Sequence, residues 1–384
     1  MDRKEALTKF FENDVSRLTY EMLKKLDCNL KKEKHSIAKK LTEEFDNFFK
    51  LVNQNQENIE SKLVFCVSIQ ILRSNIVNKK SELRLSAYDA EFYMDKNPIH
   101  YTFDFDELFK YIFEFENNVA EEVKKYVTRV NKSDVAVAVQ KTVMFYKDYL
   151  TRLLLFSIDD ILRLDSFQDL NKEKDFFLFS GEYKDNLDYI YRSADEKTKY
   201  EKTELVRKFS GGKDEFYTQL LTDLEFEELD LRNKNLCYTQ FTNSKMTLTD
   251  FALAYCICTN FSNCFISGTN FENALLYDAD FSGATLYGVM FNAAFAGLTT
   301  PKEDTFYSPG FNGVNFKNAV LNKVDFTEAD FSGADFRGAK FSDVIFENTN
   351  LENAVFDEEA LTYLELSQHQ LNSILPDKSF SEVQ

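Results

Sequence analysis

The sequence predicts an α+β protein of more than one domain, in which a mainly α-helical N-terminal domain precedes a square solenoid. Two observations carry this prediction. Apolar residues recur at helical spacing through most of the first half, and a large apolar residue recurs at every fifth position from Leu221 to Phe356. A period of five is neither the 3.6 of a helix nor the 2.0 of a strand. Short units that stack and bury one another's apolar faces explain it.

The N-terminal domain begins with two amphipathic stripes, at residues 4–27 and 37–52, with mostly charged residues between the apolar positions. Each stripe predicts a helix with one buried face. A third stripe, at 59–71, is more apolar all round and predicts a third, more buried helix. Residues 82–103 break the pattern, and Pro98 excludes a continuous helix, so a short hairpin and a packed loop both stay open there.

Helical spacing resumes at 104–130, and Ser133 is the predicted N-cap of a further long helix. The adjacent glycines Gly211 and Gly212 place the end of this domain at 212. The domain 1–212 contains no glycine-rich phosphate loop, no nucleophile elbow and no metal-spaced cluster of His and Cys. We therefore expect no enzyme, no catalytic residue and no cofactor.

The solenoid is predicted over 213–356, where large and small residues alternate at a fixed offset. A small residue lies two positions before each large one, as Ala329 does before Phe331. If the chain turns about 90° every five residues, a coil takes twenty residues and its narrow interior admits one large side chain per side. Residues twenty apart should then form ladders between coils about 4.8 Å apart. One expected ladder is Leu231, Phe251, Phe271, Phe291, Phe311, Phe331 and Leu351.

The corners of the coil are predicted two residues after each large position, where Gly, Asn and Asp are frequent. A type II turn needs a positive φ there, which these residues tolerate best. At Lys323 and Glu328 we expect type I turns instead.

The repeat fails near 297–310, and both Pro301 and Pro309 lie inside the failure. Because proline cannot donate to a backbone ladder, this segment should leave the coil as a loop. Loops on rigid scaffolds often carry recognition, so Phe306 and Tyr307 are candidate protein-contact residues. A neutral insertion is the alternative.

Three cysteines, Cys256, Cys258 and Cys264, lie close together in the sequence. The repeat explains two of them as interior residues on different sides of the coil and the third as a corner, so we expect no metal site.

Outward-facing positions beside the large residues carry a second group of apolar side chains. Such a patch on a soluble rod indicates a contact surface, covered either by the helical domain or by an external partner or a second copy. The candidate protein-contact residues are the column Tyr255, Leu275 and Phe295, the flanking Ile257 and Tyr277, and Tyr287, which is expected on the neighbouring side near the corner.

Residues 357–384 are predicted to form a C-terminal capping helix and a tail, because an open β edge would otherwise invite aggregation. Asp357 is the expected N-cap, and Pro376 ends the helix. Its candidate contact residues are Leu364, Leu371 and Ile374.

The five-residue units, such as Ala334-Asp335-Phe336-Arg337-Gly338, resemble the pentapeptide-repeat family, whose pattern is A-(D/N)-(L/F)-x-x. The resemblance implies a right-handed quadrilateral β-helix and a largely bacterial family. Some members are acidic rods that mimic duplex DNA and bind DNA gyrase, and the C-terminal helix of the family mediates dimerisation, which makes a homodimer an alternative here.

The negative charge lies mainly in the repeat half: residues 213–384 hold 10 of the 46 basic and 26 of the 64 acidic residues. Phosphate contacts require Lys and Arg, so we expect no direct nucleic-acid binding. No run reaches the roughly 18 apolar residues of a membrane span, and the N-terminus lacks the apolar core of a signal peptide. These features predict a cytoplasmic protein.

The expected function is that of a non-enzymatic protein–protein interaction scaffold with a partner of unknown identity. The alternative is an acidic DNA mimic that binds a type II topoisomerase such as DNA gyrase. That role needs acidic residues along one face. Asp230 and Asp250, and then Asp330, are predicted to share one ladder only at its two ends, with Asn270, Met290 and Gly310 between them.

Overall fold

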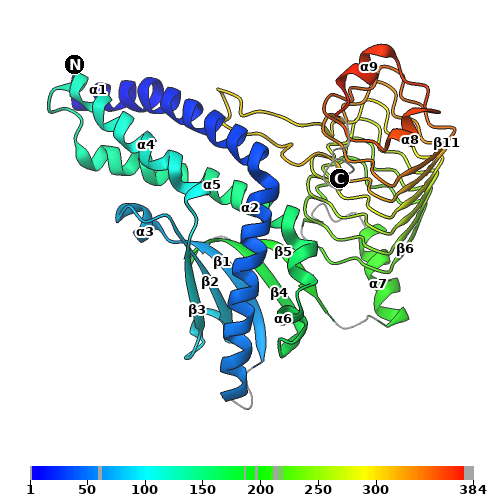
Figure 1. Ribbon diagram of the computed structural model, residues 1–384, viewed down its shortest axis with the longest axis horizontal. Coiled ribbons are helices and arrows are strands. Elements are labelled where there is room, and N and C mark those ends of the chain that lie inside the picture. Colours follow the sequence, from blue (N-terminus) through cyan, green and yellow to red (C-terminus); the bar gives the residue numbers. More distant parts are fainter. Residues whose placement is uncertain are drawn as a thin grey trace, which may run out of the picture. The chain divides into compact units, whose positions relative to one another are not determined.

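The computed structural model describes residues 2–58, 63–185, 187–194, 198–210, 216–217 and 219–375. The chain divides into two compact units (Figure 1). The first, Met1–Asp195 together with Thr300–Ser308, is called the N-terminal unit. The second, Glu196–Thr299 together with Pro309–Gln384, is called the repeat unit.

Three long helices, α2, α4 and α5, dominate the N-terminal unit. The stripes predicted as two helices form one continuous helical stretch, because α2 runs through residues 28–36 between them. A π-helical segment (Phe10–Val15) joins α1 to α2. The rings of Phe109 on α4 and Tyr146 on α5 stack at 6.2 Å in the core between the helices. The α-helices of the unit are α1 (Arg3–Lys9), α2 (Ser16–Asn58), α3 (Arg73–Val77), α4 (Asp106–Val123), α5 (Lys132–Leu162) and α6 (Asp165–Gln168).

A five-stranded sheet completes the unit, in the order β3-β2-β1-β4-β5. Strand β1 is parallel to β4 and antiparallel to β2, and β2 and β3 form an antiparallel pair. Helix α2 contacts the sheet where Tyr101 donates to Glu44 (2.7 Å), and α5 where Thr151 donates to Ser180 (3.1 Å). The strands are β1 (Val64–Ile71), β2 (Glu82–Tyr88), β3 (Ile99–Asp104), β4 (Lys172–Glu182) and β5 (Leu187–Ser193).

The helix predicted over 59–71 is wrong, because its described part contains the central strand β1. Seven of the eight residues of β1 are buried, on both of its faces. A strand covered on both faces is apolar throughout, so its sequence also contains the four-residue spacing of a helix. Residues 59–62 lie outside the described part of the chain.

The N-cap of α5 is Asn131 and not Ser133. The Asn131 side chain accepts from the Ser133 amide (2.9 Å), and the Asp134 carboxylate accepts from the Asn131 amide (2.8 Å). This capping box satisfies amides at both ends of the first turn, which a cap at Ser133 would leave unpaired.

The repeat unit is the predicted right-handed quadrilateral β-helix. One side is a six-stranded parallel sheet, and single parallel bridges join the coils on the other sides. Phenylalanine rings stack inside it, as Phe261 does on Phe281 at 4.7 Å. Its strands are β6 (Glu225–Glu227), β7 (Lys245–Thr247), β8 (Phe265–Ser267), β9 (Thr285–Tyr287), β10 (Val320–Asn322) and β11 (Lys340–Ser342).

The predicted ladder through Phe311 is wrong beyond the loop. Phe291 stacks on Phe326 at 5.1 Å, so residues 35 apart meet across the loop where residues 20 apart meet elsewhere. The loop therefore removes Phe311 from the ladders. For the same reason Asp330 follows Phe295, whereas the ladder of Asp230 and Asp250 continues to Asp325 by way of Asn270 and Met290.

The corners share a left-handed backbone whatever residue occupies them. Lys323 has φ 54° and Glu328 φ 60°, so the type I turns predicted there are wrong. The Lys323 amide donates to Ser342 O and the Glu328 amide to Glu347 O, both at 2.9 Å. These bonds to the next coil fix the corner geometry and outweigh a strain of about 1 kcal/mol per side chain.

The C-terminal end has two short helices, α8 (Glu358–Leu361) and α9 (Gln368–Ser373), in place of the single predicted helix. Asp357 precedes α8, but its carboxylate accepts from the Gly338 amide (2.6 Å) and does not cap the helix. Ser367 and Gln370 form the capping box of α9, which starts a new helix there. At the other end, Leu205 and Val206 of α7 (Lys199–Ser210) pack against the repeat core. The boundary at 212 stays a prediction, since residues 211–215 are not described.

Two corner glycines with the same handedness test how the ladder restricts side chains. A Cβ on Gly313 (φ 78°) would lie 2.2 Å from the Gly333 carbonyl oxygen, whereas a Cβ on Gly288 (φ 60°) would meet nothing within 4 Å. We expect Gly288→Ala to lower the free energy of unfolding by about 1 kcal/mol. Gly313→Ala should lower it by at least about 3 kcal/mol, because the backbone must shift. Urea unfolding followed by far-UV circular dichroism measures both, and equal losses would contradict the prediction.

Candidate functional site

Three outward residues, Tyr255, Leu275 and Phe295, form what is here called the outer apolar column. Parallel bridges pair Tyr255 with Leu275 and Leu275 with Phe295 in successive coils. Tyr255 is 48% exposed and Phe295 47%, and Leu275 is half-buried. The column ends at Asn235 on one side and Asp330 on the other. Three coils spaced by about 4.8 Å give it a height of about 10 Å.

Two predicted residues, Ile257 and Tyr277, flank the column and are half-buried. Tyr277 lies close to Gly310, where an added Cβ would be 3.1 Å from its ring. Burial raises the pKa of the Tyr277 hydroxyl, and the carboxylate of Asp330 raises it further. The ring is therefore neutral at physiological pH and adds apolar surface.

The sequence reasoning missed Leu253, which is 51% exposed at a left-handed corner two residues before Tyr255. The sequence did contain a signal for Leu253, because most corner positions carry Gly, Asn or Asp and this one carries an apolar residue. Tyr287, in contrast, does not join the column. It ends strand β9, carries the Lys323 ammonium 5.6 Å from its ring centre, and is separated from Phe295 by the side that contains Met290.

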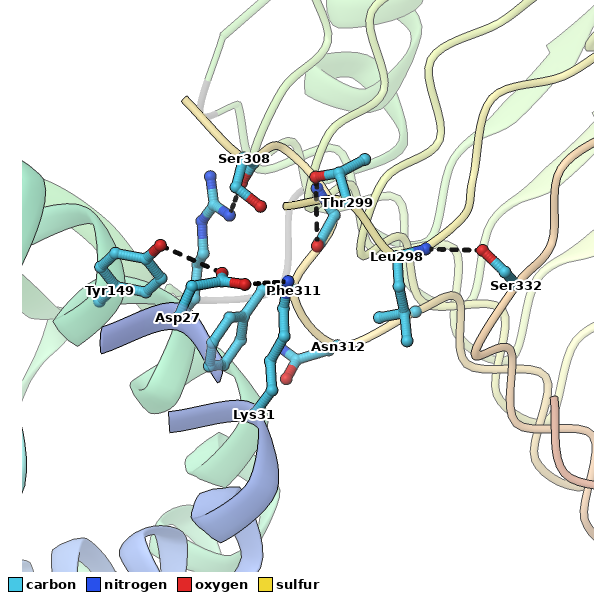
Figure 2. A network of polar contacts seen from close by, with 12 residues as sticks. Asp27, Lys31, Tyr149, Leu298, Thr299, Ser308, Phe311, Asn312 and Ser332 are labelled. Carbon is cyan, nitrogen blue, oxygen red and sulfur yellow. Dashed lines mark hydrogen bonds and ion pairs between the residues drawn. The ribbon is translucent and has the colours of Figure 1, made fainter. Parts of the chain in front are cut away.

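Hydrogen bonds join the two ends of the loop near 297–310, where it leaves and rejoins the coil. The Thr299 amide donates to Gly310 O and the Gly310 amide donates to Thr299 Oγ1, both at 2.9 Å (Figure 2). The Asp278 carboxylate then accepts from the amides of Phe311, Asn312 and Gly313 at 2.9, 2.7 and 3.2 Å. One side chain thus fixes the returning strand with three charge-assisted hydrogen bonds.

The apex of the loop, Thr300–Ser308, belongs to the N-terminal unit and packs on helix α5. The ring of Phe306 meets Phe145 edge-on at 5.9 Å. Arg152 is 4% exposed, lies 5.5 Å from the ring centre of Tyr307, and donates to Ser308 O (Figure 2). The two loop residues predicted as protein contacts therefore touch side chains of the same chain.

Buried polar groups of α2 and α5 surround Arg152. Tyr149 donates to Asp27 (3.1 Å), and Lys31 forms an ion pair with the same carboxylate (2.9 Å; Figure 2). Burial raises the pKa of Asp148, and the positive charge of Arg152 acts against that rise. This arrangement holds the loop by charge-assisted bonds and does not align an acid, a base and a nucleophile.

The remaining predicted residues are separated by the structure. Leu364 and Ile374 pack against the repeat core, whereas Leu371 is exposed. Cys256 and Cys264 lie in the coil interior, and burial raises the pKa of the Cys264 thiol to about 12. Within the described ranges, no group of three His, Cys, Asp or Glu side chains is placed to hold a metal ion. Nor does any described helix combine the length and apolar character needed to cross a membrane.

Arg152 should stabilise the attachment of the loop. We expect Arg152→Met to lower the free energy of unfolding by about 3 kcal/mol, because Asp148 and the Ser308 carbonyl lose a buried cation. The loop should also be cleaved faster by trypsin after the exposed Lys302. The control is Arg163→Met, at the exposed end of α5, which should cost less than about 0.5 kcal/mol. A tryptic rate at Lys302 that both variants leave unchanged would contradict the assignment.

Comparison with known proteins identifies the repeats. Residues 254–292 and 311–348 match the family model of pentapeptide repeats in eight copies, on either side of the loop. A comparison with curated proteins finds no match. Similar solved structures include QnrB1, a plasmid-mediated fluoroquinolone resistance protein (14% identity, 43% of this chain and 86% of that chain, TM-score 0.31). Another is HetL from the cyanobacterium Nostoc sp. strain PCC 7120, involved in heterocyst differentiation regulation (14%, 41% and 97%, TM-score 0.18). A third is a pentapeptide repeat protein of the Arabidopsis thaliana thylakoid lumen (18%, 40% and 73%, TM-score 0.14). Residues 254–292 and 311–348 of this chain are thus similar to pentapeptide repeats, in agreement with the β-helix of the repeat unit.

Proposed function

We propose that this chain is a non-enzymatic scaffold that binds a protein partner through the outer apolar column and its flanking residues Leu253, Ile257 and Tyr277. The observation that carries the proposal is the half-exposed state of Tyr255 and Phe295 on a side whose neighbouring outward positions are polar, Asn235 and Asp330. A contiguous apolar group bordered by polar residues is typical of a contact surface.

The residue types also suit an interface. Tyrosine and phenylalanine bury large areas and lose little conformational freedom on binding, and tyrosine is enriched among residues that dominate binding energy. Removing the exposed half of such a side chain from water contributes about 1 kcal/mol. The rigid ladder beneath the column reduces the entropy lost on binding, because backbone positions are already fixed.

A DNA-mimic function has weaker support. It requires acidic residues repeated along one side, and the ladder that starts with Asp230 and Asp250 places Asn270 and Met290 before Asp325 and then Ile345. A gyrase supercoiling assay tests this second hypothesis, and inhibition by the chain at low micromolar concentration would revive it.

The proposal predicts loss of a partner after Phe295→Asp or Tyr277→Asp in affinity capture from the source cell. The matched control is Phe265→Asp, because Phe265 is also a half-exposed phenylalanine (44%) but lies on the six-stranded sheet side. A charge at the column should remove the partner, since an unpaired carboxylate would be buried in the interface. A protein captured equally by all three variants would contradict the proposal.

A photo-crosslinker in place of Phe295 shows whether a captured partner or the N-terminal unit of the same chain contacts the outer apolar column. Crosslinks to the captured partner support the proposal. Crosslinks confined to peptides of the N-terminal unit would mean that the column serves contacts within the chain, and the proposal would fail.

A further inference from the structure

The last coil of the repeat unit is covered by its own chain on two of its four sides. On one side Ser373–Leu375 adds as a strand: the Asn353 amide donates to Ser373 O (2.8 Å) and the Leu375 amide to Ala354 O (3.0 Å). At the corner that leads to the next side, the Gln370 side chain donates to Phe346 O (2.8 Å) and Thr349 O (2.9 Å). A strand and a side chain thus replace the missing next coil.

Within the described part of the chain, the other two sides end in backbone donors that have no acceptor. One coil earlier, the amides of Phe326 and Glu328 donate to Ile345 O and Glu347 O, both at 2.9 Å. Their counterparts in the last coil, Phe346 and Asn348, have no acceptor for the backbone N–H among residues 219–375. Strand β11 is likewise the outermost of its sheet. Such an edge is a template for an added strand.

A groove lies along this edge, with a volume of about 740 Å³. Its floor is the segment Val344–Leu351 of the last coil, and its wall includes Glu365, His369 and Gln370. Ile345 is 49% exposed in it, and the interior residues Phe341 and Val344 beside it are only partly buried. The groove therefore offers an exposed apolar side chain, Ile345, beside backbone donors that are open for hydrogen bonds.

Charge decides which occupant fits. Glu347 and Glu365 line the groove, and Asp343 and Glu352 are exposed beside it on the last coil. A second copy of the chain would bring the same acidic residues against them, which is unfavourable at close range. A segment that carries basic side chains is attracted instead.

We propose that this end groove binds an extended, basic segment of another protein, which adds as a parallel strand to the edge Val344–Asn348. The segment accepts from the amides of Phe346 and Asn348, places an apolar side chain on Ile345 and sets Lys or Arg against Glu347 and Glu365. The chain already uses this mode on another side of the same coil, where Val355 pairs with Leu375. Strand addition of this kind takes affinity from the backbone and specificity from alternate side chains.

The test is fluorescence anisotropy with a labelled peptide of about eight residues in which valine and lysine lie two positions apart on the same face, with threonine between them. We expect saturable binding that is lost when the central valine of the peptide is replaced by proline, which removes a donor and fixes φ. A peptide with glutamate in place of lysine should bind at least about tenfold more weakly. Equal binding of the three peptides, or no binding of the lysine peptide, would overturn the proposal.

Variants of the chain locate the site. Ile345→Asp and Glu347→Lys should each weaken binding about tenfold or more. The control Glu225→Lys places the same charge change on the exposed residue of β6, at the opposite edge of the six-stranded sheet, and should change it less than about twofold. Unchanged binding to both groove variants would overturn the proposal, provided that far-UV circular dichroism shows them folded.

Hydrogen exchange gives a direct readout of the edge. The amides of Phe346 and Asn348 should become protected when the lysine peptide binds, and no protection there would overturn the parallel pairing. Sedimentation tests whether a second copy of the chain occupies the groove instead. If the chain self-associates, if this association blocks peptide binding and if Glu347→Lys abolishes it, the groove is a contact between copies and the proposal fails. Phe295→Asp should leave peptide binding unchanged, so the result is independent of the outer apolar column.

Discussion

The hydrogen bonds between successive coils are the constraint on which the repeat unit depends. Each corner amide donates to a carbonyl of the next coil, as Lys323 does to Ser342 and Glu328 to Glu347. The left-handed backbone at the corners follows from this requirement, so even Leu253 and Glu328 adopt a φ near 60°. Side-chain preference selects glycine or asparagine where it can, but the ladder sets the conformation.

The same constraint explains how the coil accommodates its loop. The chain leaves after Thr299 and returns at Gly310, and the ladder resumes because Asp278 binds the three amides that follow. The interior stack is preserved, with Phe281 on Phe316 and Phe291 on Phe326. An insertion that keeps both the stack and the ladder costs the core little, and the loop apex is then free to pack on α5 through Phe306 and Ser308.

Both proposed contact surfaces are places where the regular pattern of the repeat is interrupted. The outer apolar column puts Tyr255, Leu275 and Phe295 where polar residues stand in other coils. The end groove lies where the next coil is missing and the amides of Phe346 and Asn348 have no acceptor among residues 219–375. In a solenoid the regular positions are used for stability, so the irregular ones are available for recognition.

The sequence by itself determined the β-helix, the positions of its corners, its loop and the exposed column, because a five-residue period has no other explanation and each side chain's place follows from its position in the unit. It also predicted the long helices α4 and α5, whose amphipathic spacing is local. It did not determine the sheet of the N-terminal unit, because β1 is buried on both faces and its apolar run fits a helix equally well.

Only the tertiary structure decided which residues stack on one another across the loop. The loop keeps the spacing a multiple of five, so Phe311 fits the sequence pattern although Phe326 takes the place above Phe291. It also decided that Phe306 and Tyr307 contact α5, and that the end of the last coil is half covered. These features depend on residues far apart in the chain, and no local periodicity records which of them come together.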